Sequence, residues 1–497
     1  MPPFSFALIS VFRVTTLSII ILVSLLTPPF GYKNNIIIAY AQEEMIEGVN
    51  ASIGGEELPS IKDPNLRVQL VSKGLEFPTS MAFLGPNDIL VLEKEKGTIQ
   101  RIVNGKMLPT PVLTVNVATE VERGMLGIAV SKSDSVGSIY VFLYFTEAGG
   151  SGSGGDTDDT ISSSEPVGNR LYRYEWINNQ LVNPKLLLDL PAIPGPRHNG
   201  GVVTIGPDNN VYVIIGDVDG HETQAQNQES GEEHADGTSG ILRITQDGKP
   251  VVGIAGGEGI LGNSFPLNLY YAYGIRNSFG FDFDPVTGNI WDTENGPGYG
   301  DEINLVEPGF NSGWLEITGF PSSASSTSTD DDEEFNPADD LVSFGGKGKY
   351  SDPEFEWTDT LGPTAVKFLN SDKLGIQYVN DMFVADVVTG RTYHFDLNED
   401  RTQLILDGLL ADKIAETRDT GIENIVFAEG FGGITDLEVG PDDGYLYVVS
   451  LGHGAIYKIL PATSAVSIPD DIVEEEEEDK NIEGVGEPEE DEDSDED

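Results

Sequence analysis

A histidine and an aspartate are the residues of this chain best suited to proton transfer. His198 stands before Asn199-Gly200-Gly201, and Asp217 follows the apolar run that ends Ile214-Ile215-Gly216. A neutral imidazole titrates near physiological pH and can accept a proton, while a buried carboxylate can fix its tautomer. The pair is therefore a candidate general base with its orienting acid, and the alternative for His198 is a simple turn residue.

Two further segments place polar groups among glycines. Arg276-Asn277 carries guanidinium and amide donors in fixed forks that suit a planar anion, and the alternative is an arginine that ties loops together through backbone carbonyls. In Gly296-Pro297 a strained backbone can point consecutive carbonyls at a hard cation, and the alternative is a plain turn. Asp301-Glu302 can either bind a cation or cap a loop.

A recurring strand–turn–strand pattern predicts the elements that position these residues. Gly, Pro, Asn and Asp supply turn dihedrals, and the β-branched and aromatic residues that follow suit a buried pleated surface. Six copies predict an all-β fold, a six-bladed β-propeller with long inter-strand loops and with an N-terminal strand paired to the last blade; two packed sheets are the alternative. The copies lie at residues 84–91, 137–141, 205–213, 283–291, 380–384 and 439–448.

Charge and cysteine content exclude several classes of function. The chain has 28 Lys plus Arg against 83 Asp plus Glu, a formal net charge of −55. Such a charge repels nucleic acid and anionic membrane surfaces, so we expect no nucleic-acid partner. Because there is no cysteine, disulfides, thiolate metal sites and a cysteine nucleophile are all excluded.

The composition along the chain predicts four segments. Residues 1–41 read as a signal peptide or a membrane anchor, because Arg13 precedes an apolar run and Ala39-Tyr40-Ala41 forms a small-x-small cleavage site. Residues 42–65 are a linker, 66–460 the propeller, and 461–497 a disordered acidic tail. Both interpretations of the N-terminus export the propeller to the extracellular space, the cell surface or a periplasm-like space, with membrane contact only through such an anchor. Residues 149–166 and 321–340 are predicted surface loops.

The polar segments, in this order and on this repeat, resemble the soluble quinoprotein glucose/sorbosone dehydrogenase family, including the bacterial and archaeal aldose sugar dehydrogenases. The resemblance covers roughly residues 68–460. Its markers are His198-Asn199-Gly200-Gly201, Ile215-Gly216-Asp217, Gly274-Ile275-Arg276-Asn277, Glu294-Asn295-Gly296-Pro297, Asp301-Glu302-Ile303-Asn304 and Pro441-Asp442.

The resemblance implies a six-bladed propeller that binds pyrroloquinoline quinone (PQQ) and Ca²⁺ over its channel. It implies that His198 takes the proton of the sugar C1 hydroxyl as hydride moves to the quinone, and that Asp217 orients this imidazole. Arg276 and Asn277 would stabilise negative charge on the reduced quinone oxygens. The carbonyls of Gly296 and Pro297 would hold Ca²⁺. The implied partners are an aldose sugar and an external electron acceptor.

The chain departs from the family at the cations that bind the quinone carboxylates. The usual Lys is missing from Asp386–Gly390, and two usual Arg are missing from Gly433–Asp436. Arg123, in the stretch that normally carries a Gln, is predicted to supply a cation; Arg197 is a second candidate. Arg391 is three residues past the missing Lys, and odd spacing along a strand puts it on the opposite face.

Two functions are compatible with this pattern. The first is an exported PQQ-dependent aldose sugar dehydrogenase. The second is a noncatalytic surface propeller that binds a glycan or a protein. We predict the enzyme, because His198 and Asp217 are both present.

Overall fold

The computed structural model describes residues 58–132, 137–149, 166–228, 234–251, 259–321 and 336–463. The predicted signal segment, most of the linker, most of the tail and most of both predicted loops lie outside these residues. Within them the helices are single turns, namely α2 (Gln224–Asn227), α3 (Pro337–Asp340), η1 (Ile376–Tyr378) and η2 (Gly408–Leu410). A search of the described residues finds no helix with the length and apolar character needed to cross a membrane.

The described strands pair into six sheets. Each sheet is named here by the first strand of its repeated strand–turn–strand segment. The β3 sheet holds β3 (Pro78–Gly85), β4 (Asp88–Glu93), β5 (Thr98–Val103), β6 (Lys106–Met107) and β7 (Leu113–Thr114). The β8 sheet holds β8 (Met125–Lys132), β9 (Ile139–Ala148), β10 (Pro166–Ile177) and β11 (Gln180–Leu190). The β12 sheet holds β12 (Val203–Ile205), β13 (Val211–Ile215), β14 (Gly240–Ile244), β15 (Tyr270–Tyr273), β19 (Phe310–Asn311) and β20 (Lys349–Tyr350).

The other three sheets complete the set. The β16 sheet holds β16 (Gly280–Phe283), β17 (Ile290–Glu294), β18 (Asp301–Val306), β21 (Phe355–Trp357) and β25 (Ile414–Ala415). The β22 sheet holds β22 (Pro363–Phe368), β23 (Met382–Asp386), β24 (Thr392–Phe395), β26 (Val426–Glu429) and β1 (Ser60–Ile61). The β27 sheet holds β27 (Ile434–Val439), β28 (Leu446–Ser450), β29 (Ala455–Pro461) and β2 (Leu66–Lys73).

The six strand–turn–strand segments of the sequence lie at equivalent places in these sheets. Each forms the turn between the first strand of a sheet and the second, or the start of that second strand. Every one of these turns contains an Asn or Gly with positive φ, which these two residue types adopt most readily. These residues are Asn87, Gly137, Asn209, Gly288, Asn380 and Gly444.

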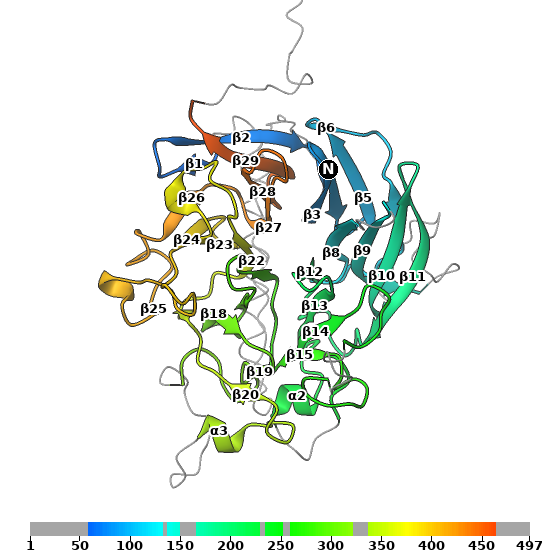
Figure 1. Ribbon diagram of the computed structural model, residues 1–497, viewed down its shortest axis with the longest axis vertical. Coiled ribbons are helices and arrows are strands. Elements are labelled where there is room, and N and C mark those ends of the chain that lie inside the picture. The colour runs from blue at the N-terminus through cyan, green and yellow to red at the C-terminus, as the bar shows by residue number, and fades with distance from the viewer. Residues whose placement is uncertain are drawn as a thin grey trace, which may run out of the picture.

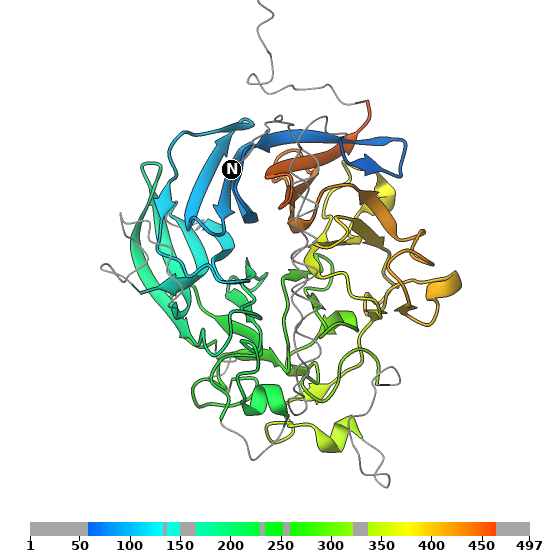
Figure 2. The same cartoon turned by 180° about the vertical axis from the view of Figure 1, so that it is seen from behind.

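The sheets surround a common centre, as Figures 1 and 2 show from opposite sides. A buried apolar cluster joins each sheet to the next around the ring, and one such cluster joins the β27 sheet to the β3 sheet. In the cluster between the β16 and β22 sheets, Trp291 and Trp357 of the β16 sheet pack with Tyr393 of the β22 sheet. Burial of these faces between neighbours, roughly 25 cal/mol per Å² of apolar area, holds the ring together.

The ring is closed by a strand from the beginning of the propeller. Leu66–Lys73 (β2) pairs antiparallel with Ala455–Pro461 (β29), which confirms the predicted N-terminal closure. The prediction of an all-β propeller is confirmed and the alternative of two packed sheets is wrong, while the count of six blades stays a prediction that the number of sheets favours.

The predicted linker needs a correction. Ser60–Ile61 (β1) lies within residues 42–65 and pairs with β26, so the paired backbone begins before residue 66. A two-residue strand has no apolar alternation, and its pairing to a distant strand leaves no local signal in the sequence.

Candidate functional site

A cavity of about 320 Å³ lies at the centre of the ring. Its walls come from the first strand of all six sheets, and its polar residues come both from these strands, as Lys367, Asp436 and Glu438 do, and from the loops beside them. This volume is within the range of pockets that hold small organic molecules. The predicted residues His198, Arg276, Asn277 and Gly296 all line it.

His198 and Asp217 form a directly bonded pair in the wall of this cavity. The distance from His198 Nδ1 to Asp217 Oδ1 is 2.5 Å, and both residues are buried. Trp314 Nε1 donates to Asp217 Oδ2 over 2.8 Å, and the Asp219 backbone N–H donates to Oδ1 over 3.0 Å. Burial acts to raise the pKa of Asp217, but His198, Arg276 and Trp314 bring it below the ordinary value. An ionised Asp217 keeps the proton on Nδ1, so Nε2 is the atom that can accept a proton.

Glycine at position 216 allows the segments of this site to meet. A Cβ there would lie 2.3 Å from the Arg276 carbonyl oxygen and 2.7 Å from that of His198. The Asp217 backbone N–H donates to the Arg276 carbonyl over 2.9 Å across this contact. Any side chain at Gly216 would separate the base, its orienting acid and the arginine.

Arg276 and Asn277 present both used and unused polar atoms to the cavity. Arg276 donates to the carbonyls of Asn295, over 2.7 Å, and Gly296, over 3.1 Å, and its guanidinium lies over the Trp314 ring at 5.3 Å. The alternative role of tying loops together is thus present. Within the described residues Arg276 Nε, a donor, and Asn277 Oδ1, an acceptor, are buried without a hydrogen-bond partner, so the polar groups of this pair are not fully satisfied.

Glu122 is a site residue that the sequence analysis did not identify. Its Oε2 accepts from the His198 backbone N–H over 2.5 Å and from Asn277 Nδ2 over 3.2 Å, and the residue lines the cavity. It therefore fixes the base and the amide together. Its contact partners are far away in sequence, so no local pattern identifies it.

Arg123 does not reach the cavity, contrary to its predicted role. Its guanidinium donates to the backbone carbonyls of Ala192 and Gly195, both over 2.5 Å. The chain turns here, with the Arg123 N–H donating to the Glu120 carbonyl over 3.1 Å, and this turn leaves Glu122 lining the cavity while Arg123 bonds elsewhere. Arg197, the second candidate, does line the cavity and lies 3.7 Å from Asp219.

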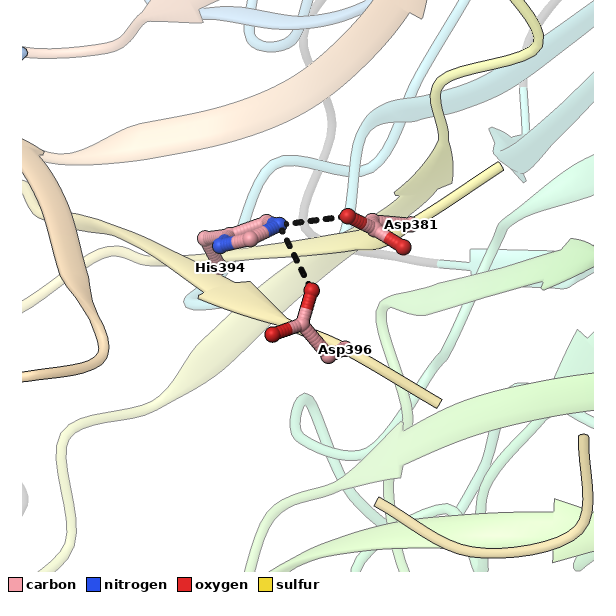
Figure 3. A group of neighbouring side chains, drawn as sticks. All are labelled: Asp381, His394 and Asp396. Atoms are coloured by element: carbon pink, nitrogen blue, oxygen red, sulfur yellow. Dashed lines mark hydrogen bonds and ion pairs between the residues drawn. The ribbon is translucent and has the colours of Figure 1, made fainter. Parts of the chain in front are cut away.

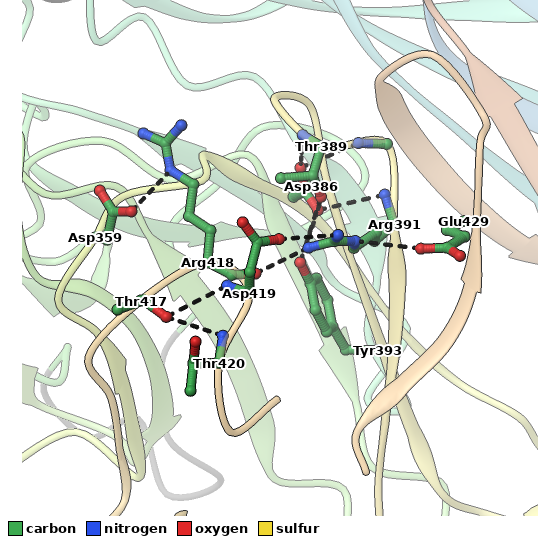
Figure 4. A network of polar contacts seen from close by, with 11 residues as sticks. Asp359, Asp386, Thr389, Arg391, Tyr393, Thr417, Arg418, Asp419, Thr420 and Glu429 are labelled. Atoms are coloured by element: carbon green, nitrogen blue, oxygen red, sulfur yellow. Dashed lines mark hydrogen bonds and ion pairs between the residues drawn. The ribbon is translucent and has the colours of Figure 1, made fainter. Parts of the chain in front are cut away.

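The two segments that lack the expected cations line the cavity with two valines, a threonine and a carboxylic acid. These residues are Val387, Val388, Thr435 and Asp436. Arg391 lies in an outer polar network, as predicted, where it donates to Asp419 Oδ1 over 3.0 Å and to the Arg418 carbonyl over 2.8 Å (Figure 4).

A lysine takes part in the cavity from another direction. Lys94 lines it and donates to the Val121 carbonyl over 2.7 Å. Burial lowers the pKa of Lys94, and Glu95 and Glu122 oppose this effect. Lys94 comes directly after β4, at a strand end that carried no recognisable motif. It is a second cation, beside Arg197, that can approach a bound anion.

The loop at Gly296-Pro297 is held by a buried aspartate. Asp301 Oδ1 accepts from the Gly296 N–H over 2.9 Å, and Oδ2 accepts from Leu361 and Gly362, each over 2.8 Å. Of the two roles considered for Asp301, the structure shows the loop cap. Burial raises the pKa of Asp301 to about 6, although the three N–H donors lower it.

Three further carboxylates lie next to this loop and were not predicted as a group. Asp292 and Glu294 alternate along β17, and Glu302 on β18 is directly opposite Glu294. Burial raises the pKa of all three, that of Glu294 to about 7. Both oxygens of Asp292 are buried without a hydrogen-bond partner in the described part of the chain. Because an unpaired buried carboxylate is costly, this group favours either protonation or a compensating positive charge.

Asp436 makes the stability of the cavity wall depend on pH. Its Oδ2 accepts from the Met81 N–H over 2.7 Å and from Ser80 Oγ over 3.0 Å. Burial, and then Glu438, raise its pKa from 3.8 to about 8. The folded protein thus keeps a proton that the unfolded chain releases, so this contribution to stability is full below pH 3.8 and is lost as the pH rises to about 8.

We expect Asp436→Asn to gain stability relative to the wild type as the pH rises from about 5 to about 8, because the amide cannot ionise. Urea unfolding of both proteins at each pH measures the two free energies. A difference that stays constant between the two pH values would contradict the prediction.

Comparisons with known proteins identify the relatives of this chain. A family model described as Glucose / Sorbosone dehydrogenase matches residues 75–458. An aldose sugar dehydrogenase of Escherichia coli is 23% identical over 405 residues, which cover 80% of this chain and 93% of that protein. A solved putative oxidoreductase (glucose dehydrogenase) from Thermus thermophilus is 26% identical with a TM-score of 0.58, over 80% of this chain and 100% of that one.

A second solved structure shows the same fold. It is the PQQ-bound form of an aldose sugar dehydrogenase from Streptomyces coelicolor, 23% identical with a TM-score of 0.55, over 81% of this chain and 99% of that one. The family model spans most of the propeller, including every residue of the candidate site. The chain therefore belongs to the glucose/sorbosone dehydrogenase family.

Proposed function

We propose that this protein is a PQQ-dependent aldose sugar dehydrogenase that oxidises the C1 hydroxyl of a sugar and passes electrons to an external acceptor. The observation that carries the proposal is the His198–Asp217 pair at 2.5 Å in the wall of the central cavity. Beside it Arg276 and Asn277 keep buried polar atoms without partners. Family membership supports an oxidoreductase role.

The cavity residues fit a flat anionic cofactor. Arg276 and Asn277 would meet the quinone oxygens, while Arg197 and Lys94 would approach carboxylates from positions other than those of the family cations. The carbonyls of Gly296 and Pro297 would hold Ca²⁺. When bound, PQQ with Ca²⁺ supplies a two-electron acceptor.

The residues of the chain then have separate tasks. His198 accepts the proton of the sugar hydroxyl at Nε2, and Asp217 stabilises the imidazolium that forms. Trp314 positions Asp217 through its indole N–H. Arg276 places positive charge where negative charge develops during the oxidation. Glu122 holds the His198 backbone close to Asn277 by accepting a hydrogen bond from each.

The proposal includes the architecture and the location of the protein. Each of the six sheets would be one blade of a six-bladed propeller, with a domain from residue 66 to residue 460. Residues 1–41 would direct the export of this domain, as a cleaved signal or as an anchor. The acidic tail would follow the domain at its C-terminal end.

Titration of the full chain with PQQ and Ca²⁺ tests the proposal. We expect a change in quinone absorbance at micromolar concentration, and oxidation of aldoses with an artificial electron acceptor. Absence of both binding and activity would defeat the enzyme. The noncatalytic glycan- or protein-binding propeller would then be the better account, and the apolar Val387 and Val388 at the place of the family cation are the observation that favours it.

Calcium should stabilise the folded protein. The Gly296-Pro297 carbonyls and the nearby Asp292, Glu294 and Glu302 are brought together only by folding. We expect Ca²⁺ at 100 times its Kd to add about 2.7 kcal/mol, seen as a higher melting temperature than in chelator. Mg²⁺ at equal concentration is the control, since it gives up its water reluctantly. Equal melting temperatures in Ca²⁺ and in chelator would refute this.

A further inference from the structure

A second cluster of metal-binding side chains lies on the β22 sheet. Asp381 precedes β23, and His394 and Asp396 lie at the end of β24 (Figure 3). His394 Nε2 is 2.9 Å from Asp381 Oδ2 and 3.7 Å from Asp396 Oδ1. One ligand atom from each residue lies within 4.8 Å of the others. None of the three lines the central cavity, so this cluster is separate from the proposed active site.

The pairing of β23 with β24 forces the two aspartates together. Met382 pairs with Phe395, so the next pair outward is Asp381 opposite Asp396. Like charges directly across a sheet are destabilising. Burial raises the pKa of Asp396, His394 lowers it, and Asp381 raises it again. Among the described residues neither aspartate has an ion pair with a lysine or arginine.

The imidazole between them is held in one orientation. The His394 ring lies 5.1 Å from Tyr378 and 5.1 Å from Phe383, with Phe427 at 6.2 Å. Its backbone N–H donates to the Ile425 carbonyl over 2.8 Å. This packing leaves Nε2 directed at the carboxylates, as Figure 3 shows. A ligand held in place before binding loses little entropy when the metal arrives.

We propose that Asp381, His394 and Asp396 bind one divalent transition-metal ion, of which Zn²⁺ is the representative. One imidazole nitrogen and two carboxylate oxygens are ligands that Zn²⁺ accepts, with further positions filled by water. A 2+ charge neutralises the two opposed carboxylates. Ca²⁺ and Mg²⁺ are poor occupants, because they prefer oxygen ligands alone. The bound ion cross-links β23 to β24 and stabilises this sheet.

The experiment compares four full-length proteins: the wild type, His394→Gln, Asp396→Asn and His221→Gln. His221 is the matched control, since its Nε2 lies 2.6 Å from Asp236 but meets one carboxylate only. Zn²⁺ is titrated in competition with a chromophoric chelator, and melting temperatures are measured with and without Zn²⁺. Asp396→Asn removes the charge repulsion, so we expect its melting temperature without metal to be no lower than that of the wild type.

We expect the wild type and His221→Gln to bind one more Zn²⁺ at micromolar concentration than the other two proteins, and only they should gain melting temperature from it. The weak cation binding of the acidic tail is common to all four and cancels. Equal Zn²⁺ binding in all four proteins would overturn the proposal. So would an equal gain in melting temperature in all four. Because no PQQ is present, neither result depends on sugar oxidation.

Discussion

His198→Ala is expected to lower the turnover of sugar oxidation by about 10²- to 10⁴-fold, because general-base catalysis contributes on that scale. Binding of PQQ should change little, since the residues proposed to meet the quinone are Arg276 and Asn277, which line the cavity beside His198. The fold should remain intact, because within the described part of the chain the His198 side chain hydrogen-bonds to Asp217 alone. The measurement is steady-state turnover of the reconstituted protein with an aldose and an artificial electron acceptor.

A matched histidine serves as the control for this variant. His221 also pairs with an aspartate, at 2.6 Å from Asp236, but it does not line the cavity. His221→Ala should therefore keep the turnover of the wild type. Turnover of His198→Ala within a factor of about three of the wild type would show that another group takes the proton, and would remove the base from the mechanism.

Asp217→Asn tests the origin of the same effect. An amide at this position can accept from Trp314 but cannot stabilise the imidazolium, and it fixes the wrong tautomer of His198. A loss close to that of His198→Ala would indicate that the two residues act as one unit, for which losses are not additive.

The parts of the fold that depend on local dihedrals could be predicted from the sequence. The six turns need Asn or Gly at positive φ, and these residues stand at regular places before β-branched and aromatic runs. β1 could not be found in this way. It is two residues long and its partner β26 is more than 360 positions away, so nothing in its own composition reports the pairing.

The residues of the candidate site were likewise predictable only where a local sequence pattern marks them. His198, Asp217, Arg276 and Asn277 lie in glycine-rich segments, because only close backbone contact brings them together, and Gly216 shows why. Lys94 and Trp314 belong to ordinary strand ends and loops. Their roles arise from contacts between distant segments, such as the bond from Trp314 Nε1 to Asp217 Oδ2, which sequence spacing does not encode.

Arg123 illustrates the remaining error. Charge alone suggested that it replaces a missing cation, but a side chain can only act on the side of the chain toward which it points. Glu122 points into the cavity and Arg123 bonds backbone carbonyls instead. Arg391, by contrast, was expected to face away from the site, and it donates to Asp419 and to the Arg418 carbonyl.

Arg276→Ala should weaken both PQQ binding and turnover, in contrast to the variant of the base. A charged hydrogen bond is worth about 1.5–3 kcal/mol, so the Kd for PQQ should rise about 10- to 150-fold. Turnover at saturating PQQ should also fall, by about 10²- to 10³-fold, because the guanidinium faces the charge that develops during oxidation. Absorbance titration gives the Kd, and turnover is then measured at saturation.

Arg197→Ala distinguishes this role from simple charge attraction. Arg197 lines the cavity and is paired at 3.7 Å with Asp219, but it lies outside the contacts of Arg276 with Asn295 and Gly296. A residue that only binds a carboxylate contributes equally to ground state and transition state, so Arg197→Ala should raise the Kd for PQQ and leave saturated turnover unchanged. If Arg276→Ala behaved in the same way, its guanidinium would be a second anchor, and stabilisation of the reduced quinone would have to come from Asn277 and the bound cation.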